Sequence, residues 1–119
     1  MNKFILMIFH ALLLASLLAS SHGVLKWVSV QPHDSYFELL FSQWKYILLA
    51  LMIYGFVFFY YILLLRTSPI SSLYPIYTGL SVLAVMLIGR MVFSEAISIL
   101  HGVGAALILT GIVLMGWNS

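Results

Sequence analysis

Long apolar stretches separated by short polar connections are the main feature of this sequence. A helix needs about 20 apolar residues to cross the hydrocarbon core of a bilayer, roughly 30 Å thick, because each residue rises about 1.5 Å. Four stretches reach that length, at about 4–23, 46–65, 70–89 and 97–117. Lipid offers no hydrogen-bond partners to an open backbone, and four spans are too few for a closed barrel. The pattern therefore predicts an all-α membrane protein with four transmembrane helices.

The connections predict how these helices lie beside one another. RTSP joins the second span to the third and about RMVFSEA joins the third to the fourth, so the last three spans are expected to be antiparallel neighbours. The first connection, VSVQPHDSYFELLFSQWK, is longer and mixes charged with aromatic residues. This composition suits a short helix at the membrane surface, and an ordinary surface loop is the alternative. Residues 1–119 are expected to form a single domain.

The first span has a second interpretation. Lys3, an apolar stretch and small residues near a possible cleavage site also resemble a secretory signal peptide. We expect a retained transmembrane helix instead. With four spans, Lys3 and Arg66 lie on one side of the membrane, while Lys26, Lys45 and Arg90 lie on the other. This difference is too small to predict the orientation of the chain in the bilayer.

Composition excludes several classes of function. The chain is 64% hydrophobic and 7% charged, which is typical of a membrane protein rather than a water-soluble domain. It has no cysteine, and its net charge of +2 comes from scattered basic residues that form no cluster for nucleic acid. His10 and His101 lack the spacing of metal ligands. We therefore expect no metal or other cofactor, no nucleic-acid partner and no enzymatic activity, since no nucleophile or paired acids occur at usable spacing.

The third span carries a polar stripe. Tyr74, Tyr77 and Ser81 follow i, i+3 and i+7, so they share one helix face. Hydroxyl groups in lipid need partners, and this face is expected to bind the sugar or phosphate of a substrate, although an interfacial aromatic belt is the alternative. Pro75 and Gly79 lie in the same half of the span and are expected to act as a hinge.

The first span carries a groove of small residues that ends at a cation. The residues on this face are Ala15, Ala19, His22 and Lys26. Lys26 is expected to meet a substrate phosphate, and His22 is a further substrate-binding candidate on the same face. Ser16 and Ser20 on the neighbouring face are expected to bond a sugar hydroxyl. The alternative is that Lys26 reaches toward the headgroups and the small residues serve only helix packing.

Two further features lie at the fourth span. Gly104 and Gly111 are seven residues apart on one face, where small residues allow helices to approach in lipid. They are the expected dimer interface, with packing inside one subunit as the alternative. Glu95, with Ser94, precedes the span and is expected to cap its N-terminus, where the helix dipole favours a negative charge.

Four short spans, LYPIYTG at the start of the third and HGVGAALILTGIVLMG in the fourth give the chain a resemblance to a known family. It resembles the small multidrug resistance family and its relatives in the drug/metabolite transporter superfamily over nearly its whole length. LYP, the long first connection and LLASLLASSHGVLK look most like the paired small subunits that flip undecaprenyl-phosphate-linked aminoarabinose for lipid A modification. Drug-exporting members carry a glutamate midway along the first helix, whereas the matching LLASLLASS has no carboxylate. Proton-coupled cation export therefore lacks its main chemical group.

These observations and the resemblance lead to one expectation and two alternatives. The expectation is a subunit of an inner-membrane transporter in bacteria that flips a polyprenyl-phosphate-linked sugar, as a homodimer or as a heterodimer with a related small subunit. The polyprenyl tail would stay in the lipid bilayer while the headgroup crosses. The alternatives are a small multidrug-type exporter of cationic or small polar compounds, and a non-transporting accessory subunit of a membrane glycosyltransferase.

Overall fold

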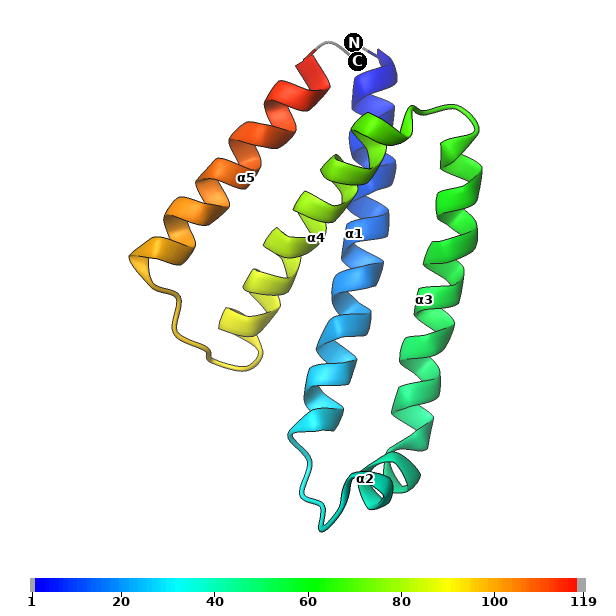
Figure 1. Ribbon diagram of the computed structural model, residues 1–119, viewed down its shortest axis with the longest axis vertical. Helices are drawn as coiled ribbons and strands as arrows, with labels where there is room; N and C mark the ends of the chain where they lie inside the picture. Colours follow the sequence, from blue (N-terminus) through cyan, green and yellow to red (C-terminus); the bar gives the residue numbers. More distant parts are fainter. Residues whose placement is uncertain (1, 118–119) are drawn as a thin grey trace.

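The computed structural model describes residues 2–117, which contain five helices (Figure 1). The helices are α1 (Asn2–Ser29), α2 (Tyr36–Ser42), α3 (Trp44–Leu65), α4 (Ile70–Met91) and α5 (Ile99–Trp117). All except α2 are long and apolar enough to cross a membrane. The prediction of an all-α protein with four spans is confirmed.

The ends of the long helices differ from the expected limits, most of all in α1. This helix continues past Gly23 to Ser29, because one glycine does not end a helix and Val28 is buried in the added turns. Its 28 residues extend for about 42 Å at 1.5 Å each, more than the apolar core of a bilayer. The last turns of α1 therefore reach the membrane surface.

The first connection contains a short helix, α2, and is not an ordinary surface loop. Ser35 is extended, and its hydroxyl accepts a hydrogen bond of 3.2 Å from the Glu38 N–H at the start of α2. The Glu38 carboxylate reaches back to accept from the Asp34 N–H at 3.3 Å. This reciprocal arrangement satisfies amides that a helix N-terminus otherwise leaves free.

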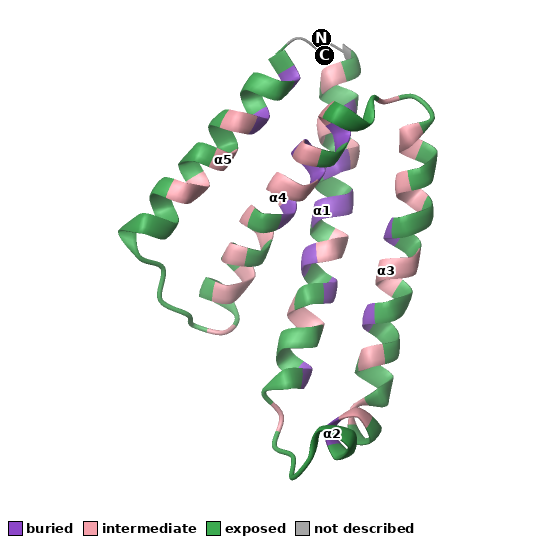
Figure 2. Cartoon of the chain, in the orientation of Figure 1, coloured by how far each residue is buried: buried purple, intermediate pink, exposed green. Residues whose placement is uncertain are grey.

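Helix α1 lies between α3 and α4 and packs against both (Figure 1). The prediction that the second and third spans pack as antiparallel neighbours is therefore wrong, whereas α4 does pack against α5. Both chain ends lie at one end of the bundle, and α2 lies at the other with the 92–98 connection (Figure 1). The α4–α5 hairpin is inclined to the α1–α3 pair (Figure 1). The buried positions gather where α1 and α4 cross (Figure 2). The core comprises Met7, Ala11, Leu14, Val57, Leu73, Ile76, Tyr77 and Ile112. The contribution of α1 to this core favours a transmembrane helix over a signal peptide.

Helix α5 packs against α4 and α1 along one face. A Cβ atom on Gly79 of α4 would lie 3.0 Å from Ile112 and 3.2 Å from Ile108, so this glycine permits the close approach of α4 and α5. Gly116 likewise leaves space for the Phe4 ring of α1. Ile112 and Gly116 are the buried residues of Ile99–Trp117. The other faces of α5 are free for lipid or a second subunit.

Candidate functional site

A pocket lies between α1 and α4 at the end of the bundle that carries α2 and the 92–98 connection. The pocket measures about 220 Å³ and is called the Lys26 pocket below. It is lined by Ala19, His22, Gly23, Lys26, Val85, Ile88, Gly89, Phe93 and Glu95. A Cβ atom on Gly23 would lie 3.4 Å from Ile88, so small residues bring the two helices close at this point.

Lys26 and Glu95 form an ion pair at the mouth of this pocket. The Lys26 Nζ lies 3.7 Å from a Glu95 carboxylate oxygen, and their side chains are 47% and 52% exposed. The Glu95 N–H donates to the Gly89 carbonyl at 3.0 Å, which folds the connection back over the end of α4. The carboxylate occupies the space that a Cβ atom on Gly89 would fill. Backbone geometry therefore positions Glu95 beside Lys26.

The prediction that Glu95 caps the fourth span is wrong. Ser98 precedes α5, and its hydroxyl accepts from the His101 N–H at 3.2 Å. The same hydroxyl lies 2.9 Å from the His101 ring nitrogen Nδ1. Ser94 has a φ of 54°, a left-handed conformation that is uncommon for residues other than glycine. This turn directs Glu95 toward α1 rather than α5.

His22 joins the Lys26 pocket to a neighbouring one. The second pocket, about 390 Å³, runs toward the middle of α4 and is also lined by Leu18, Thr78, Ser81, Val82, Val85 and Met86. The His22 ring lies 3.4 Å from the hydroxyl of Tyr54 on α3. Ser81 is buried and its hydroxyl donates to the Tyr77 carbonyl at 2.8 Å, so that oxygen already has a partner. The role of these groups in substrate binding stays a prediction.

Ser16 and Ser20 lie apart from Lys26. They are exposed on α1, and the Ser20 hydroxyl donates to the Ser16 carbonyl at 2.8 Å. Neither residue lines the Lys26 pocket. Such a bond to the preceding turn is a local alternative to contact with another molecule.

Three tyrosines form a cluster between α3 and α4, near the end of the bundle that carries the chain termini. The Tyr61 ring centroid lies 5.5 Å from that of Tyr77 and 6.3 Å from that of Tyr74. Tyr77 is buried, whereas Tyr74 is 52% exposed. Tyr61 was missed by sequence reasoning, because only the approach of the end of α3 to the start of α4 brings it to the predicted stripe. Its hydroxyl is buried and has no hydrogen-bond partner.

The tyrosine cluster and the Lys26 pocket lie at different depths. Tyr74 and Gly89 are separated by 15 positions of one helix, or about 22 Å of rise. The structure thus does not bring all predicted binding residues into one pocket. These residues are spread along most of the length of α1 and α4.

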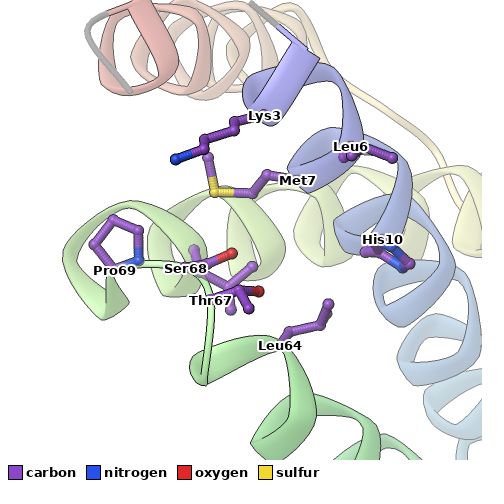
Figure 3. A pocket seen from close by; sticks show the side chains of 9 residues that line it. Lys3, Leu6, Met7, His10, Leu64, Thr67, Ser68 and Pro69 are labelled. Atoms are coloured by element: carbon purple, nitrogen blue, oxygen red, sulfur yellow. The ribbon is translucent and has the colours of Figure 1, made fainter.

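A further pocket, of about 280 Å³ and mainly apolar, lies at the end that carries the chain termini (Figure 3). Lys3 and His10 of α1 face Thr67 and Ser68 of the α3–α4 connection across it (Figure 3). The His10 ring is held by the Tyr60 hydroxyl. Sequence reasoning used Lys3 only for the signal-peptide alternative and the orientation of the chain, and RTSP only as a connection between spans, so it missed this juxtaposition.

The remaining predicted residues lie on α4 and α5. Helix α4 continues through Pro75, and the Thr78 hydroxyl donates to the Tyr74 carbonyl at 2.7 Å. Gly104 and Gly111 have nothing within 4 Å of an added Cβ atom. Both glycines line hollows between α4 and α5, and their role in a dimer or in packing within one subunit stays a prediction.

Similar proteins carry the name "probable 4-amino-4-deoxy-L-arabinose-phosphoundecaprenol flippase subunit ArnE". The chain is 34% identical to that of Enterobacter sp. (strain 638) over 73 residues, 61% of this chain and 67% of the relative. It is 34% identical to that of Pseudomonas aeruginosa (strain UCBPP-PA14) over 92% of this chain and 97% of the relative. For Pseudomonas paraeruginosa (strain DSM 24068 / PA7), the identity is 33% over 89% and 95%.

No protein-family profile matches the chain, and no solved structure matches it significantly. The relatives are bacterial flippase subunits, and four helices of this chain are long and apolar enough to span a membrane. The chain is accordingly a multi-pass protein of the bacterial inner membrane. Relatives matched over nearly their whole length, and the resemblance in the third and fourth spans, lead to one conclusion: the chain belongs to the family of ArnE flippase subunits.

Proposed function

We propose that this chain is a subunit of a translocase that moves 4-amino-4-deoxy-L-arabinose, linked to phosphoundecaprenol, across the inner membrane. The names of its relatives support this substrate. The observation that carries the proposal is the Lys26 pocket, where a half-exposed cation lies beside a wall of small residues between two spanning helices. A phosphate can meet the Lys26 ammonium there, while the polyprenyl chain lies along apolar faces of the helices.

The other predicted binding residues are proposed to act as the headgroup moves along α1 and α4. His22 borders both the Lys26 pocket and the next one toward Ser81. Ser16 and Ser20 are proposed to bond the sugar, and Ser20 would donate to it only after leaving its bond to the Ser16 carbonyl. Tyr77 and Ser81 are buried, so contact with a substrate requires α4 to move.

A bend of α4 at Pro75 and Gly79 is proposed to supply that movement. Pro75 has no N–H, so the helix lacks one bond of its ladder at this point. Gly79 lies against Ile108 and Ile112, so a bend there also shifts α5. The tyrosine cluster on the same half of α4 would open during this step, and the partnerless Tyr61 hydroxyl would gain a polar partner.

Assembly with a second subunit is proposed because four helices enclose little space. The open surface at Gly104 and Gly111 suits another copy of this chain or a related small subunit. Transport makes and breaks no covalent bond, and we propose no enzymatic activity for the chain.

Reconstitution in liposomes tests the proposal. The chain, alone and with related small subunits, should move the lipid-linked amino sugar between leaflets. Lys26→Met should remove most of this flux, whereas Lys45→Met, an exposed cation at the same end, should leave it intact. Absence of flux in every combination with folded protein would contradict the proposal. Copurification with a glycosyltransferase, together with no flux, would instead indicate an accessory subunit.

A further inference from the structure

The headgroup named for the relatives carries two opposite charges. Its phosphate is negative, and the 4-amino group of its sugar is a basic amine that is protonated near neutral pH. These two groups lie at opposite ends of one sugar ring. A site that recognises this headgroup therefore needs a cation and an anion close together, both within reach of solvent.

The mouth of the Lys26 pocket contains such a pair. The Lys26 Nζ and a Glu95 carboxylate oxygen are 3.7 Å apart, and about half of each side chain is exposed. Exposed ion pairs of this kind contribute little to stability, so little is lost when each member takes a new partner. In the empty protein each side chain neutralises the other.

Three features of the backbone place the Glu95 carboxylate at the mouth of the Lys26 pocket, where it does not cap a helix. The Glu95 N–H donates to the Gly89 carbonyl, Gly89 leaves the space that the carboxylate fills, and Ser94 adopts a left-handed conformation. Ser98 performs the capping of α5 instead. The placement of Glu95 is therefore a feature of the pocket.

This inference rests on the proposed function. We propose that Lys26 and Glu95 give up their ion pair when the headgroup binds, and that each then pairs with one of its two charges. Lys26 binds the phosphate, and Glu95 binds the ammonium of the amino sugar. A neutral sugar on the same phosphate leaves Glu95 without a partner and close to the phosphate. Glu95 thereby determines specificity for amino sugars over neutral sugars.

Binding measurements in nanodiscs test this inference with three lipids: the polyprenyl-phosphate-linked 4-amino sugar, the same lipid with its amine formylated, and polyprenyl phosphate alone. The full chain, with its related subunit where one is needed, should bind the free amine about tenfold more tightly than the formylated lipid, as expected for a charge-assisted hydrogen bond. Glu95→Gln should remove this preference, because it weakens binding of the free-amine lipid and relieves the repulsion between Glu95 and the phosphate of the formylated lipid. Lys26→Met should weaken all three lipids.

Two variants separate specificity from folding. Gly89→Ala keeps the Glu95 charge but fills its space, so it should reduce the preference for the free amine as well. Glu38→Gln removes a carboxylate from the first connection at the same end of the bundle and should leave the preference unchanged.

The outcomes distinguish the inference from the function on which it rests. A preference that survives Glu95→Gln, or equal binding of both sugar lipids by the wild type, would overturn the role of Glu95 and leave the translocase proposal standing. Binding of none of the lipids by folded wild-type protein, with or without a partner, would overturn both.

Discussion

The crossing pair α1 and α4 differs from α5 in how it is held together. These two helices share a core of fully buried side chains, such as Leu14, Leu73 and Ile76. Helix α5 contributes Ile112 to that core, and its Leu100 and Leu107 are 81% and 68% exposed. Most of α5 is exposed (Figure 2). Apolar exposure costs nothing in lipid, so contact between helices there depends on close packing. The difference leaves most of the α5 surface to lipid, and its role in a dimer stays a prediction.

The largest effect is expected in the shared core. Leu73 is fully buried, so Leu73→Ala should lower the free energy of unfolding in detergent by roughly 2–5 kcal/mol because it leaves a cavity. Leu87, 60% exposed on the same helix, is the matched control, and Leu87→Ala should have a small effect. Equal losses from both variants would mean that this core does not hold the bundle together.

The contact of α5 with α4 should tolerate less bulk than open positions do. Gly79→Leu places a side chain against Ile108 and Ile112, and overpacking of this kind costs about 1–3 kcal/mol. Cysteine crosslinking between α4 and α5 should then decline. Gly55→Leu on α3, where nothing lies within 4 Å, should change neither stability nor crosslinking. A similar response of the two variants would remove Gly79 from the contact.

The open face of α5 should matter for assembly rather than for folding. Gly104→Leu combined with Gly111→Leu should keep the unfolding temperature of the monomer but weaken association in detergent about tenfold or more, near 1.4 kcal/mol. Sedimentation or crosslinking measures this change. Gly102→Leu serves as the control, because Gly102 also has nothing within 4 Å of an added Cβ atom but lies on another, more exposed face of α5. Unchanged assembly in the double variant would exclude this face as the interface.

The smallest effects are expected at two adjacent tyrosines of α3. Tyr61→Phe removes a hydroxyl that has no partner, so stability should stay constant or rise by up to about 1 kcal/mol. Tyr60→Phe removes the partner of His10 and should lower stability by about 1 kcal/mol. Thermal unfolding of the two variants side by side gives the comparison. Loss of stability in Tyr61→Phe would show that its hydroxyl is already bonded.

Parts of the candidate site were predictable because they depend on one helix alone. The i, i+3 and i+7 spacing places Tyr74, Tyr77 and Ser81 on related faces of α4. The short connection predicted that α3 and α4 pack side by side, which is wrong because α1 packs between them. The failure at Glu95 has a specific cause. Its position depends on the turn at Ser94 and on the approach of the 92–98 connection to α1, neither of which follows from the local pattern.

Length and hydropathy by themselves determined that this chain has four membrane-spanning helices, because each span must satisfy its own backbone within lipid whatever its neighbours are. Tertiary structure alone decided that Glu95 lies beside Lys26, that Tyr61 joins Tyr74 and Tyr77, and that Gly104 and Gly111 face open space. The physical reason is that no hydrophobic driving force favours contact of an apolar side chain with another helix over contact with lipid. The choice of neighbour then depends on the detailed fit of surfaces from residues far apart in the sequence.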